Sequence, residues 1–191
     1  MLIDDPRKLR LANEVMSRLR KSQTDAHHPT KQARFRSSIS FTPELLVRVV
    51  SGSKIQTRRP VRPAGLEPEA IDPATCPFGV VRDRIAVLEK WSRTPDGAIL
   101  YAMGCPHDTP RAPWKAARFM PRSATRHFLE VLFVRVEKLS SVSEADARAE
   151  GFESRDAFLQ AWDAIYGEGD FRSGDNPCVW VIDFSASSIL L

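Results

Sequence analysis

The sequence predicts an α+β protein: a small curled sheet or β-barrel of about five to six strands with attached helices, plus an N-terminal helix. Segments of β-like composition outnumber helical ones, and neighbouring β-like segments are not joined by regular helical crossovers. Of the 191 residues, 42% are hydrophobic and 27% are charged, as in ordinary globular proteins. This favours one domain with an appendage over a disordered, collagen-like or coiled-coil chain.

The N-terminal region combines a short amphipathic helix, predicted over residues 5–20, with a polar and basic linker over residues 21–37. We therefore expect a basic N-terminal helix and linker at 1–37 and a folded domain at 38–191. The helix could pack on the domain, contact a partner or lie along nucleic acid. Its apolar stripe consists of Leu9, Ala12, Val15, Met16 and Leu19.

The first half of the domain begins with a short strand at 38–42, followed by a helix that starts after Thr42 and ends at Gly52, where glycine permits a left-handed cap. Two prolines then exclude a long regular element in residues 53–63, and a loop continues to Gly79. Further strands are predicted over 84–91 and 98–102.

The second half begins with loop-like residues 103–126, which contain four prolines. The longest β-like run follows at 127–139. Ser143 and Asp146 form a capping-box-like start of a helix that ends at Gly151. A further helix is predicted over 155–166 and a central strand over 178–184.

The positive charge is unevenly distributed. The chain carries a formal charge of +4, from 28 basic and 24 acidic residues. Residues 1–36 hold nine basic and four acidic residues, or +5, which leaves 19 minus 20, or −1, for the remainder. The 21 arginines against seven lysines fit phosphate binding, but a GC-rich genome produces the same bias.

Two acid-free basic segments lie in the domain. Such segments attract polyanions and release their counterions, and Trp114 and Phe119 in the second one could stack on bases. The alternative is a solvated surface with Trp114 in the core. The first segment contains Lys54, Arg58, Arg59 and Arg62, and the second Arg111, Lys115, Arg118, Arg122 and Arg126.

Compartment and cofactors are predicted from absences in the sequence. No run of about 18 apolar residues occurs. The first residues of the chain include acids at the place where a secretory signal peptide has basic residues. We expect a soluble cytoplasmic protein with no membrane partner. The cysteines are odd in number and far apart in the sequence, which fits reduced thiols better than a disulfide framework. They are Cys76, Cys105 and Cys178. Without a C-x-x-C pair, zinc binding by these cysteines and His107 is not favoured, and we predict neither metal nor cofactor.

Six ordered motifs between Ile39 and Phe184 resemble the ASCH domain family, a branch of the PUA-like fold, and in particular the short ASCH proteins of bacteria and phages. The first is a helix followed by G-x-K-x-x-T-R-R. The others are CPFGVVRDRIAVLEKW, RFMPRSATRHFLEV, VSEADARAEGF, WDAIYG and NPCVWVIDF. Residues 1–37 lie outside the resemblance.

The resemblance implies a β-barrel whose cleft is lined by the Lys54–Arg59 segment and the helix ending at Glu150. It also implies RNA, single-stranded nucleic acid or a modified nucleoside as partner, and hydrolysis by Lys54, Thr57 and Glu150, either as a ribonuclease or as an amidohydrolase acting on N4-acetylcytidine. A non-catalytic RNA-binding module that reads a base in the cleft is the alternative. An interaction protein acting through the N-terminal helix is a third class, without a motif behind it.

Elementary chemistry leaves the role of Lys54 open. Arg58 and Arg59 would lower its pKa by repulsion, whereas Glu150 would raise it. A charged Lys54 suits phosphate or oxyanion binding, with Glu150 as the base. Because residues three apart in a strand face opposite sides, Lys54 and Thr57 reach one site only if the chain bends.

The remaining site predictions concern nucleic-acid contacts and the cleft wall. Arg82, Ala86 and Leu88 depart from the Gly, Trp and Arg that the family usually has. Glu89 could equally be a structural strand residue, Lys54 and Thr57 turn residues, and Glu150 a surface acid. The predicted nucleic-acid contacts are Arg58, Arg59, Arg62, Arg118, Arg122, Arg126 and Trp114, and Glu89 and Asp83 are candidate cleft residues.

Overall fold

The computed structural model describes residues 35–103 and 113–188. These residues belong to one compact unit, Arg34–Leu191. The predicted N-terminal helix lies outside the described residues, as do Cys105, His107 and Arg111. Within the described part, no helix has both the length and the apolar character needed to cross a membrane.

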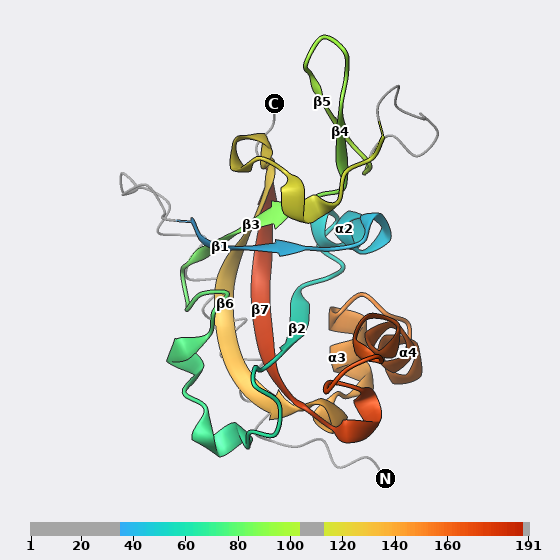
Figure 1. Ribbon diagram of the computed structural model, residues 1–191. Coiled ribbons are helices and arrows are strands. Elements are labelled where there is room, and N and C mark those ends of the chain that lie inside the picture. Colours follow the sequence, from blue (N-terminus) through green and yellow to red (C-terminus); the bar gives the residue numbers. More distant parts are fainter. Residues whose placement is uncertain (1–34, 104–112, 189–191) are drawn as a thin grey trace. The chain divides into compact units, whose positions relative to one another are not determined.

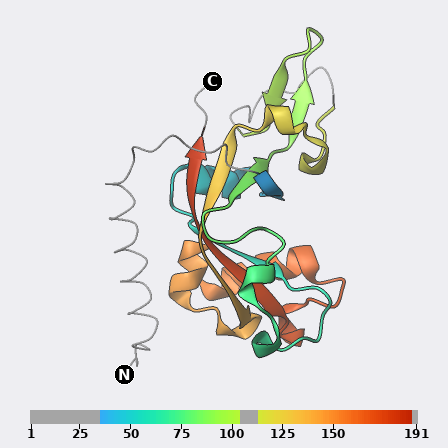
Figure 2. The same cartoon turned by 90° about the vertical axis from the view of Figure 1, so that its left-hand side faces the viewer.

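A curled, mixed five-stranded sheet forms the centre of the domain, in the order β1-β3-β6-β7-β2. Its two long strands, β6 and β7, lie side by side and bend together (Figures 1 and 2). β1 pairs with β3 in parallel and the other neighbours are antiparallel. The α+β class and the curled sheet are thus confirmed. The strands are β1 Phe35–Ser40, β2 Gln56–Pro60, β3 Arg84–Leu88, β6 His127–Lys138 and β7 Cys178–Ser188.

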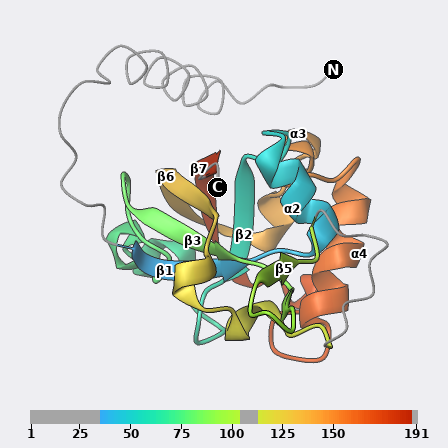
Figure 3. The same ribbon diagram turned by 90° about the horizontal axis from the view of Figure 1, so that it is seen from above.

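Three helices pack beside the sheet on the side of its β2 edge (Figures 1 and 3). Thr42 caps α2, and Gly52 follows it with a φ of 77°, in the left-handed region that favours glycine. Ser143 and Asp146 form the predicted capping box of α3. The helices are α2 Pro43–Val50, α3 Glu144–Ala149 and α4 Arg155–Tyr166.

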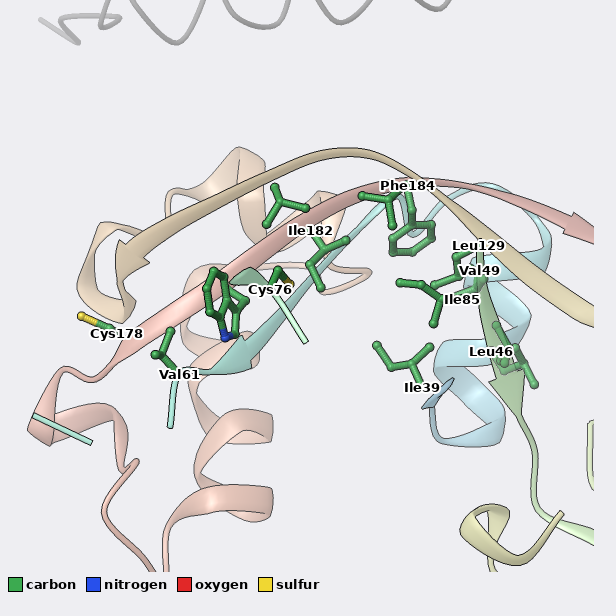
Figure 4. Close-up of a cluster of buried hydrophobic side chains, with 14 residues drawn as sticks. Ile39, Leu46, Val49, Val61, Cys76, Ile85, Leu129, Cys178, Ile182 and Phe184 are labelled. Atoms are coloured by element: carbon green, nitrogen blue, oxygen red, sulfur yellow. The ribbon is translucent and has the colours of Figure 1, made fainter. Parts of the chain in front are cut away.

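The first seven residues of β7, 178–184, are buried on both faces of the sheet, which explains why this part of the strand is almost entirely apolar. Successive side chains alternate between faces. Trp180, Ile182 and Phe184 join a core that includes α2 (Figure 4), whereas Val179 and Val181 join a second core under α3 and α4. We call the first side of the sheet the inner face and the second the helix face.

Several elements differ from the sequence prediction. β1 begins at Phe35, inside the linker predicted over 21–37, and β7 continues beyond residue 184 to Ser188. Residues 56–60, where the prolines predicted irregular chain, form β2 at the sheet edge, and Pro60 is its last residue, where a missing N–H is tolerated. The strand predicted over 84–91 divides into β3 and β4, Trp91–Arg93. β4 pairs with β5, Ile99–Tyr101, in a separate two-stranded sheet.

Candidate functional site

The end of the G-x-K-x-x-T-R-R motif, residues 57–59, lies in β2, whose side chains alternate between the two faces. Lys54 precedes this strand. Arg58 lies opposite Val181, and Arg59 lies opposite Trp180. Because directly paired residues project from the same face of a sheet, Arg58 points to the helix face and Arg59 to the inner face. The two adjacent arginines therefore lie in different environments.

Arg58 lies in a buried charge network on the helix face. It is 1% exposed. Its Nη1 lies 3.3 Å from Glu150 Oε1 and also donates to Gln56 Oε1. Its Nη2 lies 3.4 Å from Glu137 Oε2 and 3.5 Å from Asp146 Oδ1. This burial and pairing do not favour the predicted contact of Arg58 with nucleic acid, because its charge is already shared by three carboxylates.

Arg135 is the second cation of this network. Its Nε donates to Glu137 Oε1 over 2.7 Å, and its Nη1 donates to Asp183 Oδ2 over 3.0 Å. Its Nη2 lies 3.5 Å from Asp146 Oδ1. Gln56 Nε2 donates to the other oxygen of Asp183 over 2.7 Å. The two arginines are thus held in place by shared carboxylates.

Two aspartates of the network, Asp183 and Asp146, have opposite pKa shifts. Burial raises the pKa of Asp183, although Arg135 and the hydrogen bond from Gln56 oppose this. Burial also acts to raise the pKa of Asp146, but its hydrogen bonds from Ser143 and the nearby arginines outweigh burial, and the pKa lies below its usual range.

Lys54 and Glu150 come together at the end of α3. Lys54 is 2% exposed, and its Nζ donates to Glu150 Oε2 and Glu150 O, both over 2.7 Å, and to Gln56 O over 2.8 Å. Every hydrogen of the ammonium group therefore has an acceptor. The Glu150 carboxylate bridges Lys54 and Arg58, so both of its oxygens contact buried cations.

Local backbone geometry explains this approach. Ile55 N donates to Ala149 O over 2.9 Å, which joins the segment before β2 to the end of α3. Gly151 has a φ of 86°, and a Cβ atom there would lie 3.3 Å from Lys54 Cβ. Glycine thus suits this position both in conformation and in space.

The pKa of Lys54 is lowered. Burial is the largest cause, and Arg59 and Arg58 lower the pKa further by repulsion, while the charge and hydrogen bond of Glu150 act in the opposite direction. Both effects that the sequence predicted are present, and burial, which it did not reveal, decides the net direction.

Thr57 lies on the inner face and is fully buried. Its Oγ1 accepts a hydrogen bond from Arg59 Nη1 over 2.8 Å. Among the described residues, no hydrogen bond joins the Thr57 side chain to Lys54 or Glu150. The structure therefore brings two of the three predicted catalytic residues into contact and turns the third toward Arg59.

Arg59 connects the two edge strands of the sheet. Its guanidinium donates to Arg58 O over 2.8 Å and, across to β1, to Ser40 O over 3.2 Å. The ring of Phe41 lies between the two cations: its centroid is 5.4 Å from Arg59 Cζ and 5.5 Å from Lys54 Nζ. Cation–π attraction adds to the hydrogen bonds that fix Arg59.

A cavity of about 760 Å³ lies beside Arg59. Its volume falls in the range of small-molecule sites, roughly 300–1,000 Å³. Three aromatic rings and two arginines contribute to its wall, and Arg62, one of the arginines, is exposed and stacks over Phe171 at 4.7 Å. The lining includes Arg59, Arg62, Leu66, Ile71, Asp72, Phe78, Tyr166 and Trp180.

The candidate cleft residues Glu89 and Asp83 do not line this cavity. Glu89 is 1% exposed and accepts two hydrogen bonds from Arg126, over 2.9 and 2.8 Å. Asp83 Oδ2 accepts from Val80 N over 2.9 Å within the turn before β3. Both carboxylates hold local structure.

The other predicted nucleic-acid contacts lie in the segment after residue 113. Arg118 and Arg122 are exposed, whereas Trp114 is half-buried. Arg126 is half-buried and bound to Glu89, so its position favours a structural role. Among the described residues, no group of three or more histidine, cysteine or acidic side chains could hold a metal ion.

Sequence reasoning missed several residues of the site. Tyr166 and Trp180 line the cavity from α4 and β7, and Arg135, Glu137 and Asp183 belong to the buried network. One signal was present in the sequence: Arg135 and Glu137 are charged residues at alternate positions next to the apolar residues Val134 and Val136 of β6, a pattern that indicates a polar partner on one face.

Comparison with solved structures gives a structural likeness at low sequence identity. No family model and no curated protein matches the chain. The crystal structure of protein EF3133 from Enterococcus faecalis V583, assigned to the family model DUF984, is similar with a TM-score of 0.44 and 12% sequence identity, over 93% of this chain and 93% of that chain.

Proposed function

We propose that this protein is an ASCH-type domain of PUA-like fold that binds a nucleobase, from single-stranded RNA or a modified nucleoside, in the cavity beside Arg59. The observation that carries the proposal is the cavity wall, which combines the rings of Phe78, Tyr166 and Trp180 with two arginines. Unstacked bases bind proteins by stacking on aromatic rings and by hydrogen bonds at their edges. The cavity supplies both kinds of group.

Backbone conformation supports the ASCH alignment. Arg82 occupies the position where the resemblance expects glycine, and its φ is 74°. Nearby Gly79, which the resemblance also includes, has a φ of 129°. A left-handed conformation is the property for which glycine is favoured. This turn thus has the geometry expected from the motif, although the residue at 82 differs.

Binding fits the geometry better than hydrolysis because the side chains of Lys54 and Glu150 are already paired with each other and with buried neighbours. Lys54 donates all three of its hydrogens, and Glu150 contacts a cation through each oxygen. A general base for Thr57 needs a free lone pair within hydrogen-bond reach of the hydroxyl. Arg59 binds Thr57 Oγ1 instead.

Calorimetric titration with cytidine, N4-acetylcytidine and a short single-stranded RNA tests the proposal. We expect Arg59→Met and Tyr166→Ala each to weaken binding by about tenfold or more, because each removes a stacking or hydrogen-bonding group worth more than about 1.4 kcal/mol. Arg148→Met is the matched control, since it removes an exposed charge on α3. Binding that is equal in all three variants would refute a base site in this cavity.

Hydrolysis is a second candidate, with Lys54, Thr57 and Glu150, which lie outside the lining of the cavity, as catalytic residues. The lowered pKa of Lys54 favours it, because a lysine acts as a base only in its neutral form. In this reaction Lys54 would give up one of its hydrogen bonds to Glu150 or Gln56 to reach the Thr57 hydroxyl.

Turnover of N4-acetylcytidine and of single-stranded RNA separates the two candidates. If Thr57 is a nucleophile, Thr57→Val abolishes turnover, whereas Thr57→Ser, which keeps a hydroxyl, retains part of it. Lys54→Ala and Glu150→Ala should also lose turnover, with circular dichroism to verify folding. Nucleoside binding without turnover in the wild-type protein would leave binding as the function.

A further inference from the structure

The small sheet of β4 and β5, with the segment that follows residue 113, forms a distinct part of the domain, which we call the arm. In Figures 1 and 2 the two strands project away from the end of β3. Trp91 and Lys115 exchange backbone hydrogen bonds of 3.2 and 2.7 Å, so the segment after residue 113 is attached to β4. None of these residues lines the cavity beside Arg59.

Two cations of the arm lie over one buried ring. Lys115 Nζ lies 4.9 Å from the Trp91 ring centroid, and Arg93 Cζ lies 5.9 Å from it. Arg93 follows Trp91 by two residues in β4, so both side chains project from the same face. Trp91 is 4% exposed, whereas Arg93 and Lys115 are exposed. The ring thus fixes two neighbouring positive charges at the surface.

An exposed aromatic residue lies close by in the chain. Phe119 is 63% exposed, and Arg118 Cζ lies 4.8 Å from its ring centroid. Arg122 is also exposed. Within the described part of the chain, no carboxylate lies within 4.0 Å of the charged atoms of Arg93, Lys115, Arg118 or Arg122.

Arg126 plays a different role from these cations. It binds Glu89 through two hydrogen bonds, donates to Met103 O over 2.9 Å and lies 4.0 Å from the ring of Tyr101. Tyr101 is the cross-strand partner of Trp91. Arg126 and Glu89 therefore stabilise the base of the arm. The exposed positive charge of the arm comes from its other cations.

We propose that the arm surface, defined as Arg93, Lys115, Arg118, Phe119 and Arg122, binds single-stranded nucleic acid. The cations would contact phosphates, and Phe119 would stack on an unpaired base. An arginine stacked on a ring keeps its N–H groups in the guanidinium plane, where they reach phosphate oxygens. A duplex covers the faces of its bases, so the exposed ring favours a single strand. This proposal does not depend on ligand binding in the cavity.

Fluorescence anisotropy of a labelled single-stranded oligonucleotide, as RNA and as DNA, measures this binding at several salt concentrations with the full chain. We expect Arg93→Gln combined with Lys115→Gln to weaken binding and to reduce the slope of log K against log salt by about 1.4, because each phosphate contact on a single strand contributes about 0.7. Phe119→Ala should weaken binding by about tenfold and leave the slope unchanged, because stacking releases no counterions.

Arg148→Gln combined with Arg172→Gln is the control, because it removes the same charge from exposed positions on α3 and beside Asp175. An equal loss in the control and the arm variant would refute the arm surface, since net charge alone would then explain binding. Wild-type protein that binds anionic lipid vesicles but no oligonucleotide would also overturn the proposal. Titration of the arm variants with cytidine separates the two sites, because binding in the cavity should be unchanged.

Discussion

The two faces of β2 have opposite properties although their residues alternate in one short strand. On the helix face, Arg58 is buried and paired with three carboxylates. On the inner face, Arg59 binds Thr57 and backbone oxygens and contributes to a cavity wall. A motif of consecutive basic residues thus divides into a structural and a ligand-facing half, because side chains in a strand alternate.

The largest expected difference between Arg58 and Arg59 therefore lies in their contribution to the free energy of unfolding. Arg58→Met leaves the carboxylates of Glu150, Glu137 and Asp146 with less compensation in a buried site, and we expect a loss of roughly 3–5 kcal/mol in the free energy of unfolding. Arg59→Met removes hydrogen bonds at a half-buried position and should cost about 1–2 kcal/mol. Urea unfolding of both variants measures this difference.

Equal losses for the two variants would contradict the division of β2 into a structural and a ligand-facing half. If Arg58→Met does not fold, Arg58→Lys offers a milder test, because it keeps the charge and loses the forked geometry. Its loss of stability should still exceed that of Arg59→Lys.

The pH dependence of stability tests the ion pair of Lys54 with Glu150. Because the pKa of Lys54 is lower in the folded protein than the unfolded value of about 10.4, the unfolded chain holds more protons between these two values. The contribution of Lys54 to stability therefore rises with pH through this window, by at most about 1.4 kcal/mol per pH unit. Lys54→Met should lack this rise.

Urea unfolding of the wild-type protein and Lys54→Met between neutral pH and pH values near the unfolded pKa provides the comparison. The stability of the wild-type protein relative to the variant should increase toward alkaline pH. A relative stability that falls with pH would mean that the ion pair with Glu150 outweighs burial and raises the pKa of Lys54.

The smallest expected effect concerns Thr57. Thr57→Val keeps the shape of the side chain and removes the acceptor of the Arg59 hydrogen bond, so we expect a loss of about 1 kcal/mol. Thr57→Ser keeps the acceptor. If Thr57 orients Arg59, Thr57→Ser should bind cytidine more tightly than Thr57→Val does. Calorimetric titration of both variants measures this, and equal cytidine affinities would show that Arg59 is positioned without Thr57.

Local sequence patterns predicted most of the elements. The caps of α2 and α3 were predicted correctly because each depends on hydrogen bonds between residues three positions apart in the sequence, and the apolar spacing of residues 155–166 predicted α4. β2 was not predicted as a strand because its ladder depends on a partner about 120 residues away in the chain, and the prolines around it indicate irregular structure when considered alone.

The site was predicted less completely than the fold. The ASCH resemblance selected Lys54, Thr57 and Glu150, and two of them form an ion pair across 96 positions of sequence. Their hydrogen-bond partners could not be predicted, since Gln56 O and Arg58 depend on how α3 meets β2. Nor could the cavity residues Tyr166 and Trp180, which come from separate elements.

The sequence by itself determined the α+β class, the helix caps, the approximate positions of most strands and the two clusters of positive charge. Those properties depend on neighbouring residues, on periodicity and on composition. Only the tertiary structure decided that Arg58 is buried and Arg59 faces a cavity, and that Arg126 binds Glu89 while Arg93 and Lys115 lie over Trp91. Burial and pairing are set by residues distant in sequence, and they determine what each positive charge can bind.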